Sequence, residues 1–397
     1  AENKENKMHN EQKVTKSVYW IGSNDFITPR FDNYIPLKRG ISYNSYFIDD
    51  EKTCILDAVD NAARDLFLGN VKELLHDRPL DYIIVNHMEP DHSGSLLELA
   101  KRYPEAKICA TPAALKMFEQ YFHEPMAERY IRTNEKLVID LGHHKMRFIP
   151  APMVHWPEVM VEYEKTEKIL FSADGFGKFG ALDSEDDEGW ACEARRYYFN
   201  IVGKYGAQVQ KLLKAAATLD IQTICPLHGP ILTENLGHYL EKYDIWSSYK
   251  VESEGVVIAY TSVYGNTKKA VELLAQKLEE KGCPKVTVFD LARDDMAKAV
   301  EDAFRYGKLV LATITYNGDI FPFMRTYIEN LTERSYQNRT IGLIENGSWA
   351  PAAARIMQGM FEKSKNITWL ENNVKITSSL SEANEAEIEA MAEELCK

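Results

Sequence analysis

The sequence has no long hydrophobic run, no tract of basic residues and no closely spaced pair of cysteines. A membrane-spanning helix needs about 20 mostly apolar residues, and the N-terminal residues are polar where a signal peptide would be apolar. The formal net charge is −13. Because phosphate repels an acidic chain without a basic patch, we expect neither nucleic acid nor a membrane as a partner.

The cysteines are few and scattered. Their spacing excludes a Cys-x-x-Cys redox or zinc module and argues against an iron centre held by thiolates. Thiols without a pairing pattern are typical of a reducing compartment, so the sequence predicts a cytoplasmic protein. The six are Cys54, Cys109, Cys192, Cys225, Cys283 and Cys396.

A length of 397 residues predicts two or three domains rather than one core. Apolar and charged residues make up 45% and 27% of the chain, the proportions of a globular protein. The polar residues 1–16 are predicted to form a flexible tail. A short charged break at residues 251–255 separates two different patterns, which predicts domains at 17–251 and 252–397.

The first domain is predicted to alternate short β-rich runs with helices. The predicted strands are 54–59, 82–86, 107–111, 136–140, 146–150, 159–164, 169–172 and 223–226, and the predicted helices are 64–75, 95–102, 207–218 and 239–250. An acidic stretch, residues 183–188, is predicted to be an exposed loop.

The second domain shows a regular strand–helix alternation, which predicts a parallel, doubly wound sheet. Its predicted strands are 256–260, 286–291, 308–313 and 340–345, and its predicted helices are 267–281, 294–304, 323–333 and 383–396.

Four residues of metal-binding type occur within six positions, directly after the apolar run 81–85. They are His87, Glu89, Asp91 and His92. A buried strand fixes the loop that follows it, so several side chains can point at one metal. Glu89 adds an anionic oxygen to the imidazole nitrogens, which favours iron or manganese over a softer metal. The motif therefore indicates redox chemistry rather than hydrolysis.

Three other predicted strands are each followed by one such residue: His155, Asp174 and His228. Each alone is more typical of an ordinary histidine or a turn, but with the motif they fit a site for two metals. One metal would be held by His87, Glu89 and His155, the other by Asp91, His92 and His228, and Asp174 would bridge them. A shared carboxylate offsets the repulsion between neighbouring cations. The histidines predicted not to bind metal are His9, His76, His123, His143, His144 and His238.

The loop after the strand at 256–260 is rich in Ser, Thr, Asn and Gly and leads into a helix. Hydroxyls and backbone N–H groups at a helix N-terminus bind phosphate. Without a lysine, the loop suits the monoester of FMN better than a triphosphate. Two later strands end in similar loops, and such ends meet at one crevice. The predicted FMN-binding residues are Thr261, Ser262, Tyr264, Gly265, Asn266, Thr267, Thr315, Tyr316, Asn317, Gly318, Asn346, Gly347, Ser348 and Trp349, the last stacking on the flavin ring.

The chain resembles the flavodiiron proteins, or A-type flavoproteins, over nearly its whole length. The matching pieces are the motif from His87 to His92, residues 40–46, 152–157, 171–174 and 228–230, and the three loops, which resemble those of flavodoxin. The resemblance implies an α/β fold class, with an N-terminal metallo-β-lactamase-like αββα sandwich followed by a flavodoxin-like doubly wound parallel sheet.

Two positions depart from the family pattern. Asp32 stands where members often have a histidine that can approach the metals. The flavodoxin signature is one residue short between Thr267 and Ala270. Tyr197 and Tyr198 lie on a predicted helix, where one could donate a hydrogen bond in the pocket, although core packing is the more ordinary role.

The resemblance implies an oxidoreductase whose cofactors are two non-haem iron ions and FMN. Electrons would enter at FMN, pass to the di-iron site, and reduce dioxygen to water, nitric oxide to nitrous oxide, or both. It also implies a head-to-tail homodimer or a dimer of dimers. Because the sequence ends soon after the flavodoxin-like part, the electron donor is expected to be a separate protein, rubredoxin.

The alternative function is a zinc-dependent hydrolase of the metallo-β-lactamase superfamily with an accessory flavodoxin domain. Hydrolases with this motif spacing usually carry His at the position of Glu89, and hydrolysis has no need of a flavin. Both points argue against the alternative.

Overall fold

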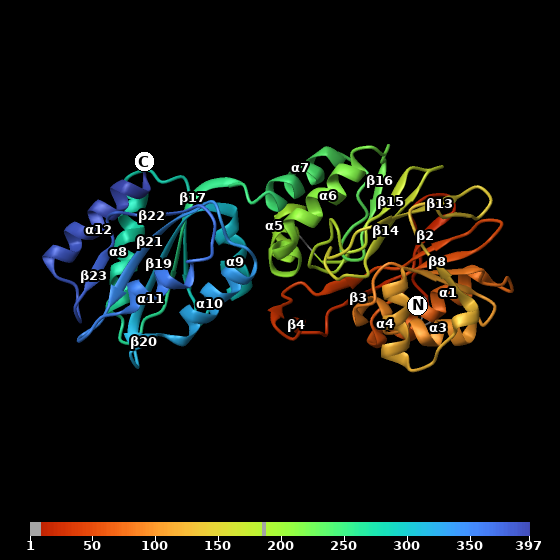
Figure 1. Cartoon of the computed structure of the whole chain (residues 1–397), viewed down its shortest axis with the longest axis horizontal. Coiled ribbons are helices and arrows are strands. Elements are labelled where there is room, and N and C mark those ends of the chain that lie inside the picture. The colour runs from red at the N-terminus through yellow and green to blue at the C-terminus, as the bar shows by residue number, and fades with distance from the viewer. Residues whose placement is uncertain (1–8, 185–187) are drawn as a thin grey trace, which may run out of the picture. The chain divides into compact units, whose positions relative to one another are not determined.

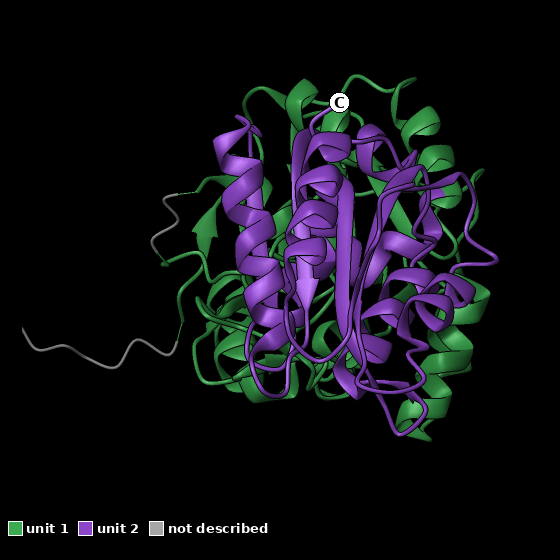
Figure 2. Cartoon of the chain, turned by 90° about the vertical axis from the view of Figure 1, so that its left-hand side faces the viewer, with its two compact units in different colours: residues 1–198, 207–243 green, residues 199–206, 244–397 purple. Residues whose placement is uncertain are grey.

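The structure is a computed structural model in which residues 9–184 and 188–397 are described. Figure 1 shows the elements in chain order. Two compact units are coloured separately in Figure 2: unit 1 contains Ala1–Tyr198 and Ala207–Tyr243, and unit 2 contains Phe199–Gly206 and Asp244–Lys397. Unit 2 therefore includes residues 199–206 and 244–251, which precede the predicted boundary at residue 252.

Unit 1 is built on two main sheets. The first has the order β1 (Gln12–Lys13), β2 (Val18–Trp20), β7 (Tyr46–Ile48), β8 (Cys54–Leu56), β9 (Tyr82–Val85), β10 (Lys107–Ala110) and β11 (Tyr130–Arg132). The second has the order β12 (Val138–Asp140), β13 (Lys145–Pro150), β14 (Met160–Glu164), β15 (Ile169–Phe171) and β16 (Thr223–Cys225). Two short ribbons join β3 (Ser23–Asp25) to β6 (Ile41–Tyr43) and β4 (Arg30–Phe31) to β5 (Ile35–Pro36).

The two sheets of unit 1 share one hydrophobic core. Trp20 and Ile84 of the first sheet belong to the same buried cluster as Met146 and Phe148 of the second. Alternation along β13 explains the packing, because Met146 and Phe148 are buried while the residues between and before them are exposed. The chain thus forms a sandwich whose strand ends carry the polar loops.

Helices lie beside both sheets of unit 1 (Figure 1). With the first sheet are α1 (Arg64–Leu75), α3 (Leu96–Arg102) and α4 (Pro112–Phe122), and with the second are α5 (Trp190–Tyr197) and α6 (Gly206–Ala216). A single turn, α2 (Pro90–Ser93), follows β9, and α7 (Leu236–Ser247) carries the chain into unit 2. The buried residues Phe67, Val71 and Leu75 recur every four positions along α1, the spacing of one helix face.

Unit 2 contains one main sheet with the order β18 (Val286–Asp290), β17 (Ser253–Tyr260), β19 (Tyr306–Tyr316), β21 (Arg339–Asn346) and β22 (Ile367–Trp369). Neighbouring strands in this order are parallel. β23 (Val374–Ile376) also pairs with β21, and the short β20 (Asp319–Ile320) folds back on β19. In chain order the main strands read 2-1-3-4-5, the flavodoxin-like arrangement, whose ligand crevice lies where the order reverses between β17 and β19.

The helices of unit 2 are α8 (Asn266–Glu280), α9 (Met296–Arg305), α10 (Pro322–Glu333), α11 (Ala353–Met360) and α12 (Glu382–Leu395). Leu274 of α8 and Ile388 of α12 pack in one buried cluster with Ile258 of β17 and Ile344 of β21. This packing holds the N-terminus of α8 at the carboxyl end of β17.

The predicted fold class is confirmed for both parts, a two-sheet sandwich followed by a doubly wound parallel sheet. Helix 64–75 is observed as predicted, and those predicted at 267–281 and 383–396 each lie one residue earlier. Helices α4 and α11 were not predicted, although Pro112 after the capping Thr111 is a recognisable start signal for α4.

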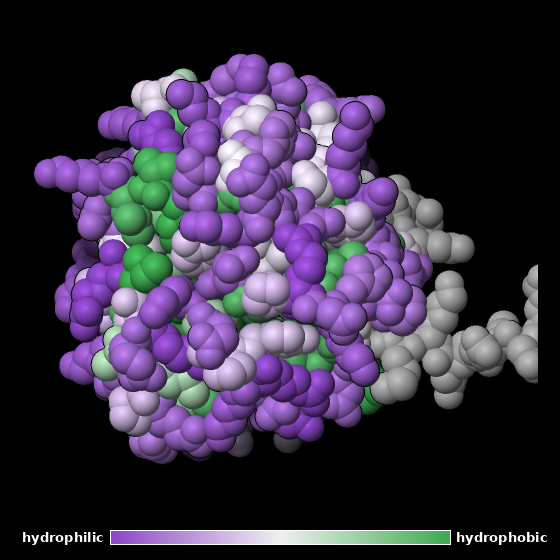
Figure 3. Space-filling model, turned by 90° about the vertical axis from the view of Figure 1, so that its right-hand side faces the viewer, coloured by the Kyte–Doolittle hydropathy of each residue, from purple (hydrophilic) through white to green (hydrophobic). Residues whose placement is uncertain are grey.

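In the parts of the chain that the structure describes, no helix has the length and apolar character needed to span a membrane. The face shown in Figure 3 is mostly hydrophilic, with hydrophobic side chains in small separate areas. Of the predicted acidic loop, residues 185–187 lie outside the described residues, as do residues 1–8 of the predicted tail.

Candidate metal centre and flavin loops

The seven side chains predicted to bind metal follow strands of both sheets of unit 1. His87, Glu89, Asp91 and His92 follow β9, His155 lies between β13 and β14, Asp174 follows β15, and His228 follows β16. Ala173, directly before Asp174, has a φ of +49°, a left-handed conformation that turns the chain sharply after β15. The sandwich therefore brings all seven to one place.

His87, Glu89 and His155 form what we call the His87 group. Glu89 Oε2 lies 3.1 Å from His87 Nε2 and 3.0 Å from His155 Nε2. Asp174 Oδ2 lies 3.2 Å and 3.3 Å from the same two nitrogens. Two imidazole nitrogens and two carboxylate oxygens thus point at one spot.

Asp91, His92 and His228 form the His228 group. Asp91 Oδ2 lies 3.2 Å from His92 Nε2 and 3.1 Å from His228 Nε2, and those two nitrogens are 3.1 Å apart. Asp174 Oδ1 is 3.2 Å from His92 Nε2. Asp174 therefore gives one oxygen to each group, the arrangement expected of a bridging carboxylate.

The centre is largely buried: His87, His92 and His228 are fully buried and Asp174 is 1% exposed, whereas the side chains of Glu89, Asp91 and His155 are 13%, 12% and 10% exposed. Burial alone would raise the pKa of Asp174, but the charges of His87 and His92 hold it well below its usual range. Burial would lower the pKa of His155, but its contacts with Asp174 and Glu89 raise it to about 9. The carboxylates therefore require positive charge between them, from protons or from metal ions.

The hydrogen bonds behind the rings show that the donor set fits metal ions. His228 Nδ1 donates to the carbonyl oxygen of Ser42, at 2.7 Å, so its Nε2 carries a lone pair unless the ring is doubly protonated. That Nε2 faces both Asp91 and His92 Nε2. The buried oxygens of Asp91 and Asp174 find no hydrogen-bond donor at a suitable angle in the described chain. Cations among these atoms would satisfy all of them, and the mixed N/O donors suit iron.

Sequence reasoning missed Glu158, the residue behind His87. Its Oε1 lies 2.8 Å from His87 Nδ1 and 2.7 Å from the backbone nitrogen of Met88. The available signal was weak: a glutamate three residues after His155, placed directly before an apolar run. The backbone carbonyl of Ser42 has no sequence signal at all.

Three other residues singled out in the sequence, Asp32, Tyr197 and Tyr198, differ in their exposure and contacts. Desolvation and the negative charges of Glu89 and Asp91 raise the pKa of Asp32 to about 6, although solvent reaches its side chain. Tyr197 is buried, with its ring 5.5 Å from that of His228, and its hydroxyl has no hydrogen-bond partner among the described residues. Tyr198 is also buried and packs against Tyr243.

A third group of metal-binding type, His143, His144 and Glu167, lies elsewhere in unit 1. His144 Nε2 is 2.7 Å from Ser17 Oγ, and its Nδ1 is 3.4 Å from Glu164 Oε2. Both ring nitrogens of His144 thus lie beside protein groups. That His143 and His144 bind no metal remains a prediction.

The residues predicted to bind FMN lie at the carboxyl ends of three adjacent strands, β17, β19 and β21. Ser262 Oγ accepts hydrogen bonds from the backbone N–H groups of Gly265 and Lys268, which shapes the loop at the start of α8. Gly265 has a φ of +89° and nothing within 4 Å of its ideal Cβ. Backbone N–H groups at a helix N-terminus in this position suit a phosphate.

The other two loops are tied to their surroundings. Thr315 Oγ1 accepts the N–H of Ala352, and Asn346 Nδ2 donates to Ser378 O. Tyr264 and Trp349 are 93% and 83% exposed, unusual for aromatic rings on fixed loops. An isoalloxazine ring lying against them would cover both.

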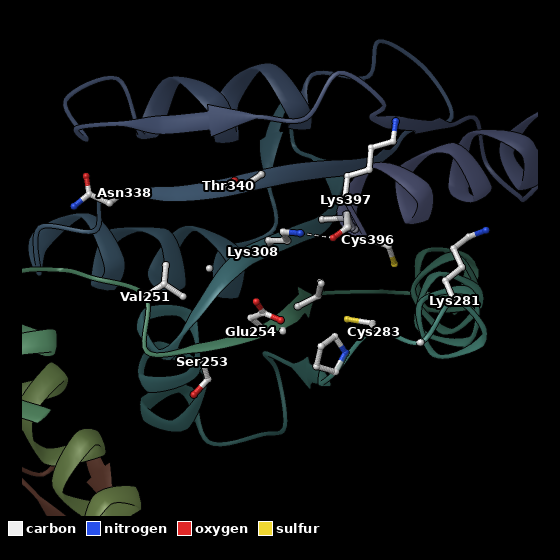
Figure 4. A pocket seen from close by; sticks show the side chains of 16 residues that line it. Val251, Ser253, Glu254, Lys281, Cys283, Lys308, Asn338, Thr340, Cys396 and Lys397 are labelled. Atoms are coloured by element: carbon white, nitrogen blue, oxygen red, sulfur yellow. Dashed lines mark hydrogen bonds between the residues drawn. The ribbon is translucent and has the colours of Figure 1, made fainter. Parts of the chain in front are cut away.

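A separate hollow of about 430 Å³ lies at the opposite, amino end of the sheet of unit 2 (Figure 4). Lys308 and Cys396 line it, and Lys308 Nζ donates to the carbonyl oxygen of Leu395. Because the predicted FMN residues lie at the carboxyl end of the strands, this hollow is not the flavin site.

Comparisons with known proteins match a different family model to each of the two parts of the chain. The family model "ODP family beta lactamase" matches residues 41–229, and the model "Flavodoxin domain" matches residues 257–374. An uncharacterized protein of Methanocaldococcus jannaschii is 31% identical over 314 residues, which cover 78% of this chain and 79% of that protein. A nitric oxide reductase of Moorella thermoacetica is 28% identical over 366 residues, covering 89% of this chain and 90% of the relative.

Solved structures show the same fold. The rubredoxin:oxygen oxidoreductase of the anaerobe Desulfovibrio gigas superposes with a TM-score of 0.91 at 23% identity, over 98% of both chains. A flavodiiron protein from Giardia intestinalis gives a TM-score of 0.90 at 24% identity, over 97% of both chains.

Proposed function

We propose a function from the premise that this chain belongs to the flavodiiron protein family. It is an oxidoreductase that passes electrons from FMN to a non-haem di-iron site and reduces dioxygen to water, nitric oxide to nitrous oxide, or both. The observation that carries the proposal is the convergence of four imidazoles and three carboxylates in two groups joined by Asp174. Relatives are named for both gases, one a nitric oxide reductase and one an oxygen oxidoreductase.

The His87 group would hold one iron, the His228 group the other, and Asp174 would bridge them. Two irons held there would supply a place for diatomic gases and share the oxidation, and bound FMN would supply electrons one at a time. The residues of the chain would fix the donor atoms, limit the access of water through burial, and balance the charge of the metals with three carboxylates. Asp32, whose side chain is open to solvent and lies within reach of the charges of Glu89 and Asp91, would be the acidic group that exchanges protons with water at the edge of the site.

FMN would bind at the crevice of unit 2. The N-terminus of α8 with Thr261, Ser262 and Thr267 would hold the phosphate, and Trp349 would stack on the ring. The strand order, the left-handed Gly265 and the exposed rings of Tyr264 and Trp349 support this assignment.

The proposal extends to the partners and the cell compartment. We propose a head-to-tail homodimer, or a dimer of such dimers, in which FMN of one copy serves the di-iron site of the other. Exposed apolar residues on unit 1, Phe26 and Ile27, support an interface of this kind. The electron donor would be rubredoxin, and the scattered cysteines, without a closely spaced pair, support a cytoplasmic setting. The domains would be residues 17–251 and 252–397 after a tail of residues 1–16, of which Gln12 and Lys13 pair with β2 as the short strand β1.

A metal analysis combined with single turnover tests the function. The purified protein is expected to hold two irons and one FMN per chain. After anaerobic reduction it is expected to be reoxidised by dioxygen, by nitric oxide or by both, and the ratio of the two rates shows which gas is preferred. Zinc in place of iron, hydrolase activity and no gas consumption would instead establish the zinc hydrolase.

Replacing Asp174 supplies the matched test of the site. D174A removes the carboxylate shared by the two groups, so gas consumption is expected to be abolished while FMN stays bound. Asp140, an exposed residue of β12, provides the control, since D140A removes an acidic side chain far from the groups. Normal turnover in D174A would refute the assigned role.

A further inference from the structure

The ring nitrogens that point away from the two metal positions have unequal partners. His87 Nδ1 lies 2.8 Å from a carboxylate oxygen of Glu158, whereas His228 Nδ1 lies 2.7 Å from a neutral backbone carbonyl, that of Ser42. His92 Nδ1 is buried and has no hydrogen-bond partner in the described chain. The ring of His87 therefore has a hydrogen-bonded carboxylate behind it, whereas no such bond to a carboxylate is present behind His92 or His228 in the described chain, although the charge of Asp57 acts on His92.

The position of Glu158 is fixed from several sides. It is 1% exposed and precedes β14, and its backbone carbonyl accepts a hydrogen bond from Thr111 Oγ1 at 2.8 Å. Its Oε1 also accepts the N–H of Met88, at 2.7 Å. Because that oxygen is an acceptor, the proton of the Glu158–His87 hydrogen bond belongs on Nδ1, and Nε2 of His87 is left to face Glu89 and Asp174.

We propose that Glu158 is a positioning residue that makes the two metal positions unequal. It holds His87 as the Nδ1–H tautomer. The His87 group would then bind its iron more tightly than the His228 group binds the other iron, and the reduction potential of the iron in the His87 group would be the lower of the two. The inference rests on the proposed function, since it concerns the irons that the two groups would hold.

The physical basis is the charge and the basicity of the ligand. A carboxylate behind a histidine ring fixes the ring and strengthens its nitrogen as a donor, and losing such a partner typically lowers metal affinity by 10–100-fold. The added charge also favours the ferric over the ferrous ion. Apart from Glu89 and Asp174 on the Nε2 side, Asp57 also contacts His87, but its Oδ1 accepts the backbone N–H of His87, at 3.2 Å, and not a ring N–H.

Two substitutions separate the charge from the hydrogen bond. E158Q keeps an oxygen that can accept from both His87 Nδ1 and Met88 N but removes the charge. E158L removes both. The control is E162Q: Glu162 is also a fully buried glutamate, on β14, and burial and the charge of Asp57 raise its pKa well above its usual value. No hydrogen bond or ion pair joins Glu162 to a predicted ligand among the described residues, so the control removes no ligand contact.

The measurements are made on the holoprotein enriched in iron-57. Iron per chain is followed during titration with a ferrous chelator, and Mössbauer spectra are recorded on the reduced protein. A potentiometric titration with dithionite in the presence of redox mediators gives the reduction potentials of the two ferric ions. FMN content serves as the measure of folding. Two irons in the unsubstituted protein test the proposed function, and the variants test the inference.

In E158L, one iron is expected to be lost at 10–100-fold lower chelator concentration than in the unsubstituted protein, while the other is retained as before. In E158Q both irons are expected to remain, with one Mössbauer signal displaced and the lower of the two potentials raised. E162Q is expected to match the unsubstituted protein.

A purely structural role for Glu158 predicts instead that E158Q leaves the spectra and both potentials unchanged, and that result would overturn the proposal. Equal loss of both irons from a folded E158L would overturn it as well. If E158L does not fold, E158Q alone decides.

Discussion

Arg339, at the start of β21, offers a test of how unit 2 is held together. Its side chain is 2% exposed, yet no acidic side chain pairs with it among the described residues; it donates instead to the carbonyl oxygens of Tyr249 and Phe304, each at 2.6 Å, and of Lys250, at 3.1 Å. These carbonyls belong to the segment after α7 and to the last turn of α9. One guanidinium therefore ties three chain segments of the unit.

Replacing Arg339 with Met keeps most of the stem and removes every donor. A hydrogen bond to a charged group contributes about 1.5–3 kcal/mol, so three of them would contribute roughly 4.5–9 kcal/mol. Several kcal/mol of this is offset, because the variant no longer buries a charge. We expect a net loss of about 3 kcal/mol, which for a unit of this size lowers the midpoint of thermal unfolding by about 6–12 °C.

The assay is the release of FMN on heating, followed by flavin fluorescence, because it reports the unfolding of unit 2. R339K, which keeps the charge but fewer donors, is expected to lie between R339M and the unsubstituted protein. R293M is the control, since Arg293 is 75% exposed and its loss is expected to change stability by less than about 0.5 kcal/mol. A midpoint for R339M within about 2 °C of the unsubstituted protein would refute the reasoning.

Three further predictions concern the flavin loop, pH and the metals. G265A places a side chain at a φ of +89°, which costs about 1–2 kcal/mol and is expected to weaken FMN binding about 5- to 30-fold in a fluorescence titration; G359A, at a glycine with open space and without a positive φ, is the control. Burial lowers the pKa of His144, but the contact with Glu164 raises it above 6.5 overall, so its stabilising contribution is full below pH 6.5 and is lost as pH rises through the folded-state pKa. Urea unfolding is therefore expected to show a larger loss for H144Q at pH 6 than at pH 9, and equal losses would contradict the pairing. Removing iron with a chelator is expected to lower the unfolding temperature of unit 1, measured by circular dichroism, by mass action, while FMN release stays where it was; a single shared shift would count against separate sites.

The clustering of the seven predicted ligands could be anticipated because each of them follows an apolar strand. His155, Asp174 and His228 lie far apart in sequence, but the strands before them end at one edge, so their pattern of apolar run followed by a lone donor carried the information. The same reasoning placed the three flavin loops at the ends of adjacent parallel strands.

The rest depended on contacts that leave no local pattern. Glu158 acts on a ring 71 positions away, and nothing in its neighbourhood distinguishes it from a surface glutamate. The partner of His228 is a backbone oxygen, which every residue has. The assignment of residues 199–206 to unit 2 was not predicted either, because no change of composition marks that segment.

Because residues 199–206 belong to unit 2, the two units cannot be separated by cutting the chain at a single position. The chain enters unit 2 at Phe199, leaves it after Gly206, and returns at Asp244. Within unit 2, the ring of Phe199 stacks on that of Phe304, with centroids 4.4 Å apart and planes 10° from parallel. A fragment beginning at residue 252 would lack Phe199, which covers Phe304, and the carbonyl oxygens of Tyr249 and Lys250, which accept from Arg339, and we expect it to aggregate. A stable flavin-binding fragment of this chain is therefore expected to need residues 199–206 and 244–251 in addition to residues 252–397.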